Sequence, residues 1–131
     1  MLTDSSGRLL VAWAPAIVWA ALIFVFSAQP NLRFAQDETI DFVVRKLGHM
    51  GVFGILALLL WRGARATSLD RPWAWALVLA VIYAVTDELH QVVVAGRHAS
   101  VVDVGVDAVG VLIGLAALRL VRDWRGRATP S

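Results

Sequence analysis

Residues 101–121 read VVDVGVDAVGVLIGLAALRLV, an apolar run interrupted by two aspartates and one arginine. A helix needs about 20 mostly apolar residues to cross a bilayer, so this run predicts a transmembrane helix. Three more apolar segments precede it, and we expect helices over residues 9–28, 45–62, 72–94 and 101–122. An open sheet would leave backbone groups unpaired in lipid. We therefore predict an all-α, polytopic membrane protein, with residues 1–131 forming a single domain of four transmembrane helices.

The composition agrees with a membrane protein. The 131 residues are 59% hydrophobic and 17% charged, and the mean hydropathy is +0.70, whereas soluble domains carry about 25% charged residues. The chain has no cysteine, which excludes disulfides, iron–sulfur clusters and thiolate zinc sites. The formal net charge is +2, but the arginines lie between apolar segments rather than in a patch with aromatic residues. We therefore expect no nucleic-acid partner.

The distribution of positive charge predicts the orientation. Four helices place both chain ends on the same side as the loop at residues 62–72. That side carries three of the ten acidic residues and eight of the twelve cationic ones, which are Arg8, Arg62, Arg65, Arg71, Arg119, Arg122, Arg125 and Arg127. The positive-inside rule then puts both termini in the cytoplasm, and residues 27–46 and 95–100 face outward.

Polar residues inside the expected helices gather near the outward helix ends. They are Lys46 and His49 of the second helix, Asp87, Glu88, His90 and Gln91 of the third, and Asp103 and Asp107 of the fourth. Their spacing places the members of each helix on or beside one face. An ionised group near mid-bilayer costs about 2.5–3.5 kcal/mol on insertion scales, so such groups need partners or water. We predict that the three helices bring them to one outward-facing pocket.

A family resemblance is carried by residues 86–114, which read TDELHQVVVAGRHASVVDVGVDAVGVLIG. Together with FSAQP at residues 26–30 and Lys46-x-x-His49, this run resembles the signature of the VanZ-like membrane proteins, and the resemblance covers residues 13–120. It implies a four-helix protein of the bacterial inner or plasma membrane. The name-giving member is associated with teicoplanin resistance at the cell envelope. Asp107 stands where asparagine is common in the family.

The pocket residues have two kinds of expected role. The candidates for acid–base chemistry, or for shaping the pocket, are His49, Asp87, Glu88, His90 and Asp103. The candidates for ligand binding are Lys46, Gln91, Arg97, Ser100, Asp107, Ser27 and Gln29. A histidine beside carboxylates is suited to general base catalysis near pH 7. Arginine captures phosphate or carboxylate through two parallel hydrogen bonds, so we expect Arg97 to hold a charged headgroup.

Two other interpretations of the same residues stay open. Asp87 and His90, at i, i+3 spacing, could ligate one metal ion, with His49 or Asp103 completing the set. No HExxH or thiolate pattern accompanies them, and we predict no metal site and no cofactor. The acids and histidines could instead form a polar network that fixes the register of the helices.

The predicted pocket suggests a function at the cell envelope. We expect it to bind, and as a further hypothesis to modify, an anionic membrane lipid or cell-wall precursor. The resemblance adds a role in glycopeptide resistance. The alternatives are a non-catalytic accessory subunit of an envelope complex and a small proton-coupled transporter, which the apolar inner halves at residues 55–60 and 75–82 disfavour. Gly110-x-x-x-Gly114 predicts close helix packing inside the bundle, with a homodimer face as the alternative.

Overall fold

Four helices make up the fold. The computed structural model describes residues 5–29, 32–94 and 98–128. Its elements are α1 (Ser5–Ser27), α2 (Glu38–Ala66), α3 (Pro72–Val92) and α4 (Val101–Ala128), and these described ranges contain no strand. Each helix is long and apolar enough to cross a membrane. The prediction of an all-α protein with four candidate transmembrane helices is confirmed, whereas the orientation in the membrane stays a prediction.

The helix boundaries differ from the predicted ones where polar residues continue a helix. Helix α2 begins at residue 38 rather than 45, because the Asp37 carboxylate caps it by accepting hydrogen bonds from the amides of Thr39 and Ile40, each at 2.9 Å. Helix α4 continues to Ala128 rather than 122. The boundaries were predicted from the lengths of the apolar runs. Such a run does not include the polar helical turns that lie beyond the hydrocarbon layer. Helix α3 begins at Pro72, as predicted, because proline lacks the N–H that a first turn leaves unpaired.

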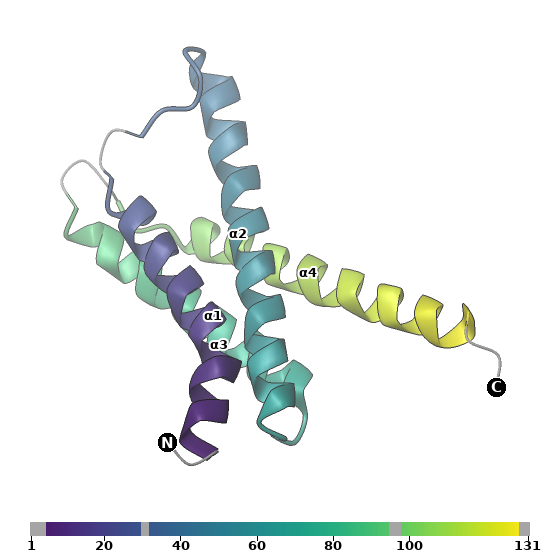
Figure 1. Ribbon diagram of the computed structural model, residues 1–131. Helices are drawn as coiled ribbons and strands as arrows, with labels where there is room; N and C mark the ends of the chain where they lie inside the picture. The colour runs from purple at the N-terminus through teal and green to yellow at the C-terminus, as the bar shows by residue number, and fades with distance from the viewer. Residues whose placement is uncertain (1–4, 30–31, 95–97, 129–131) are drawn as a thin grey trace.

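Helices α2 and α4 cross near their middles, and the C-terminal half of α4 extends away from the other three helices (Figure 1). Glycines form the crossing point. A Cβ atom placed on Gly114 would lie 2.7 Å from the carbonyl oxygen of Gly54, and one on Gly110 would overlap the backbone of Met50. The two backbones therefore approach as closely as they do because no side chain separates them. Gly110 and Gly114 pack within the chain, and a homodimer through them stays a prediction.

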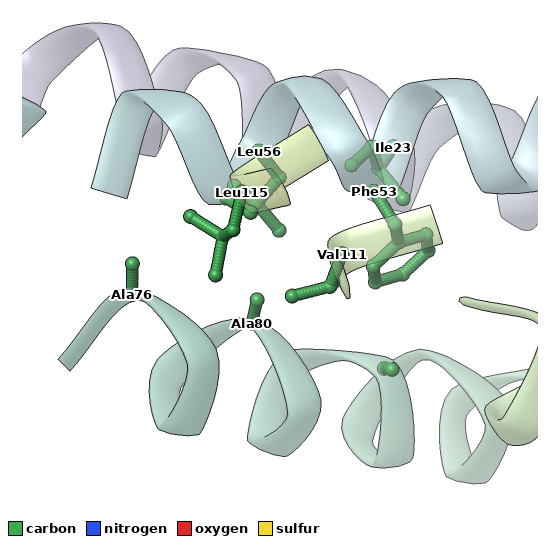
Figure 2. Close-up of a cluster of buried hydrophobic side chains, with 9 residues drawn as sticks. Ile23, Phe53, Leu56, Ala76, Ala80, Val111 and Leu115 are labelled. Carbon is green, nitrogen blue, oxygen red and sulfur yellow. The ribbon is translucent and has the colours of Figure 1, made fainter. Parts of the chain in front are cut away.

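The apolar core lies where all four helices meet. It consists of Ile23 of α1, Phe53, Leu56 and Ala57 of α2, Ala76, Ala80 and Ala84 of α3, and Val111 and Leu115 of α4. Figure 2 shows Ala76 and Ala80 pointing from α3 into this cluster. Alanines four residues apart line one face of a helix, so α3 comes close to its neighbours along that face. Many large apolar side chains outside the cluster are exposed, as expected for helices that face lipid.

Candidate functional site

The polar residues of four different helices meet at one end of the bundle. Ser27 ends α1, Asp87 and Gln91 lie in the last turns of α3, Asp107 lies in the second turn of α4, and His49 lies in the N-terminal half of α2. The side chains of Ser27, Asp87, Gln91 and Asp107 are buried. The helix ends thus form an internal polar cluster, next to the apolar core rather than on the surface.

An ion pair and a histidine–carboxylate contact connect α2 to α4. The Lys46 ammonium pairs with the Asp103 carboxylate. One helical turn deeper, His49 Nδ1 lies 3.1 Å from Asp107 Oδ1. Lys46 and His49 are three residues apart on α2, and Asp103 and Asp107 are four residues apart on α4, so the two contacts connect the facing surfaces of these helices over a full turn.

Asp87 is held by two donors. Ser27 Oγ donates to Asp87 Oδ2 at 2.9 Å, and Gln91 Nε2 donates to the same oxygen at 3.2 Å. Oδ1 of Asp87 is buried and accepts no hydrogen bond from the described residues. The same is true of Oδ2 of Asp107. Neither of these two buried carboxylate oxygens has a protein donor in the part of the chain that the structure describes, although buried polar groups are normally paired.

Glu88 closes the outer edge of the cluster. Its Oε2 accepts a hydrogen bond from the backbone amide of Ser100 at 2.9 Å. This bond ties the end of α3 to the residue that immediately precedes α4. The amide is one of the unpaired donors at a helix start, so a carboxylate there serves as a cap supplied by another helix.

A cavity of about 490 Å³ opens beside the cluster. The apolar part of its lining consists of aromatic and aliphatic side chains, and includes Trp19, Leu22 and Phe26 of α1, Phe34 of the following segment, and Phe42 of α2. The other part is polar, and includes Arg45, Lys46, His49, Glu88, Gln91, Asp103 and Asp107. Trp19 is fixed in this wall, because its Nε1 donates to the Val52 carbonyl of α2 at 2.9 Å. The cavity therefore offers an amphiphile both apolar and charged contacts.

A model of the VanZ/LLP1 family matches residues 12–122, which is most of the chain. The chain belongs to the VanZ/LLP1 family. The match includes all the helix ends that form the polar cluster, so the VanZ/LLP1 assignment and the site concern the same residues. Comparison with curated proteins and with solved structures found no significant match.

The structure brings together most of the residues that the VanZ-like pattern singled out, but not all. His90 points to α1, where its ring stacks on Phe24 with centroids 3.9 Å apart, and it does not line the cavity. Gln29 follows the end of α1, is exposed, and donates to the Val25 carbonyl of that helix. Ser100 contributes its backbone amide. Arg97 lies outside the described residues.

Sequence reasoning missed Asp41 and Arg45. Asp41 is buried, and its Oδ1 accepts hydrogen bonds from the amides of Phe34 and Ala35 at 2.6 and 3.2 Å. Its other oxygen lies 3.0 Å from Arg45 Nε, one helical turn on. These contacts fasten the segment after α1 onto α2 and bring Phe34 into the cavity wall. The i, i+4 spacing of Asp41 and Arg45 was a signal for this pair.

Proposed function

We propose that the protein binds a membrane amphiphile with a phosphate-bearing headgroup, either a phospholipid or a lipid-linked cell-wall precursor, in the cavity beside the polar cluster. The observation that carries this proposal is the combination of apolar side chains, several of them aromatic, with charged side chains in one cavity lining. Its volume of about 490 Å³ lies within the roughly 300–1,000 Å³ typical of small-molecule sites.

The apolar part of the lining suits a hydrocarbon chain. Trp19, Leu22 and Phe26 continue the lipid-facing surface of α1 into the cavity. A chain entering from the bilayer would exchange lipid contacts for contacts with these side chains. Because little apolar surface leaves water in that exchange, we expect the headgroup to contribute most of the selectivity.

The charged part of the lining suits a headgroup that both accepts and donates hydrogen bonds. Lys46 and Arg45 are the cations that would meet a phosphate. Glu88 and Asp103 are acceptors for hydroxyl or ammonium groups on the same ligand. Lipid-linked precursors and zwitterionic phospholipids carry both kinds of group. Arg97 belongs to this proposal as a further phosphate clamp, as its place in the sequence suggested.

A matched pair of glycine variants tests the cavity. Gly48 lines it, and a Cβ atom there meets nothing within 4 Å, so a side chain can leave the helix at this position and Gly48→Leu should occupy part of the cavity. Gly51, on the same helix, is equally open but is not part of the lining, and Gly51→Leu is the control. The assay is native mass spectrometry of delipidated protein with phosphatidylglycerol, phosphatidylethanolamine, diacylglycerol or a polyprenyl pyrophosphate.

We expect wild type and Gly51→Leu to retain a phosphate-bearing amphiphile and Gly48→Leu to lose it. Retention of a phospholipid alone would assign the site to membrane lipid, and preferential retention of the pyrophosphate would assign it to precursor. Equal retention by Gly48→Leu and Gly51→Leu would reject the cavity as the binding site. Equal retention of diacylglycerol would reject headgroup recognition.

We also propose that both termini lie in the cytoplasm of a bacterium and that the polar cluster faces outward. The support is the excess of arginine at the chain ends and between α2 and α3. The chain has no cysteine, so single-cysteine variants can report accessibility directly. A membrane-impermeant maleimide should label Gln36→Cys in intact spheroplasts and Ser68→Cys only after lysis. The reverse pattern would invert the topology.

A role in glycopeptide resistance is a separate proposal, which family membership suggests. Expression of the wild-type chain in a susceptible bacterium should then raise the inhibitory concentration of teicoplanin. The Gly48→Leu variant should lose this effect and Gly51→Leu should keep it. An inhibitory concentration unchanged by the wild-type chain would reject the role in resistance and leave the binding proposal to its own test.

A further inference from the structure

The residues His49, Asp87 and Asp107 bring three metal-ligand atoms together inside the bundle. One ligand atom from each residue lies within 4.8 Å of the others. The three residues come from α2, α3 and α4, so the fold rather than local sequence assembles them. Zinc bonds to nitrogen and oxygen are about 2.0–2.2 Å long, which places ligand atoms roughly 3–4 Å apart around one ion. Small side-chain rotations would suffice to close the set.

Charge and hydrogen bonding give an independent reason to expect a ligand here. Asp87 is 2% exposed and Asp107 is 0% exposed, and His49 is the base that contacts Asp107, with Nδ1 3.1 Å from Oδ1. Oδ1 of Asp87 and Oδ2 of Asp107 have no hydrogen-bond partner among the described residues. Two neighbouring carboxylates that are both buried need neutralisation by a proton or a cation.

The surroundings of Asp87 resemble the outer shell of a metal site. Ser27 and Gln91 both donate to Oδ2, which holds the carboxylate in one orientation and leaves Oδ1 available. Hydrogen bonds of this kind orient ligating carboxylates in metalloproteins. His49 and Asp107 also line the cavity. Three protein ligands leave a further coordination position, as in metal sites that bind water or a substrate.

We infer that His49, Asp87 and Asp107 bind one divalent transition-metal ion beside the cavity. An imidazole with two carboxylates is a donor set for Zn²⁺, Mn²⁺ or Fe²⁺ rather than for Cu⁺ or an iron–sulfur cluster. The ion neutralises the two buried carboxylates. The inference replaces the sequence-based expectation of no metal site, and it exchanges the suggested ligand His90, which stacks on Phe24, for Asp107.

The test uses the full chain in detergent, stripped of metal with a chelator and titrated with Zn²⁺ alone. Calorimetry and elemental analysis after desalting should give one ion per chain. Asp107→Asn should weaken binding by about 100-fold or more, and Ser27→Ala by roughly 10–100-fold, because the first removes a ligand charge and the second an orienting donor. Asp103→Asn removes a carboxylate of the same cavity outside the ligand set, and should keep the wild-type affinity.

Two results would overturn the inference. One is a wild-type chain that retains no Zn²⁺, which would leave the carboxylates neutralised by protons. The other is an equal loss of affinity in Asp103→Asn and Asp107→Asn, which would show general attraction of cations to the acidic end of the bundle.

The wild-type chain alone provides a second readout in case Asp107→Asn does not fold. Zn²⁺ should raise the Tm of the stripped protein, and Mg²⁺ at the same concentration should not, because Mg²⁺ does not favour imidazole. An equal rise with both ions would also overturn the inference. These measurements are made without added amphiphile. A negative result would therefore not contradict the proposed lipid binding, and a failure of lipid binding would not contradict the metal site.

Discussion

Replacing Gly110 by alanine should destabilise the bundle at the crossing of α2 and α4. A Cβ atom at this position would lie 2.6 Å from Cα and 2.8 Å from the carbonyl carbon of Met50, whereas carbon atoms in contact are about 3.5–4.0 Å apart. The obstacle is backbone, so the helices must separate by roughly 1 Å to admit the methyl group. Overpacking of this kind costs typically 1–3 kcal/mol, and we expect about 3 kcal/mol here.

The helix propensity of alanine offsets about 1 kcal/mol of that cost, which leaves a net loss of about 2 kcal/mol. Gly105→Ala is the matched control on the same helix, because a Cβ atom there meets nothing within 4 Å. It should be neutral or stabilising by up to about 1 kcal/mol. The two alanine variants should therefore differ in free energy of unfolding by about 2–3 kcal/mol.

The assay is equilibrium unfolding in mixed micelles, with increasing sodium dodecyl sulfate and tryptophan fluorescence as the signal. The chain has six tryptophans, and Trp19 reports on the contact of α1 with α2 through its hydrogen bond to Val52. If Gly110→Ala and Gly105→Ala unfold at the same detergent fraction, then α2 and α4 do not approach through these glycines. The described packing would then be wrong.

Two more substitutions probe contacts that position the helices. Asp37→Ala should cost about 0.5–2 kcal/mol because α2 loses its N-cap, while Asp37→Asn, which retains a capping oxygen, should stay close to wild type in the same unfolding assay. Tyr83→Phe should cost about 0.5–1.5 kcal/mol, because the Tyr83 hydroxyl donates to the Ala20 carbonyl and joins α3 to α1. An unchanged unfolding midpoint for Tyr83→Phe would show that this bond does not hold the two helices together.

Local properties of the chain made the helix count predictable. A transmembrane helix is defined by apolar length, which is read along the chain without reference to other segments. Pro72 at the start of α3 was predictable for the same reason, since the missing N–H acts within one turn. The early start of α2 also depends on a local feature of the sequence, the Asp37 cap. A prediction based on the length of an apolar run does not detect a polar capping residue.

The candidate site was predictable only in part. Helical periodicity placed Lys46 with His49, and Asp103 with Asp107, and the structure joins these two faces through an ion pair and a histidine–carboxylate contact. Periodicity also placed Asp87 and His90 on one face of α3. The structure gives them different surroundings, because Asp87 is buried within the polar cluster whereas the half-buried His90 stacks on Phe24 of α1.

The sequence by itself determined that four apolar helices would form and that their polar residues would lie near one set of helix ends. Both properties depend on residue order and on the 3.6-residue repeat alone. Only the tertiary structure decided which polar side chains meet. The close crossing at Gly110 and the rotation of each helix about its axis turn Asp107 and Asp87 inward to His49, and turn His90 toward α1. Periodicity specifies only which residues share a face about 100° wide on a helix. Backbone contacts between helices decide which residue of that face meets the neighbouring helices.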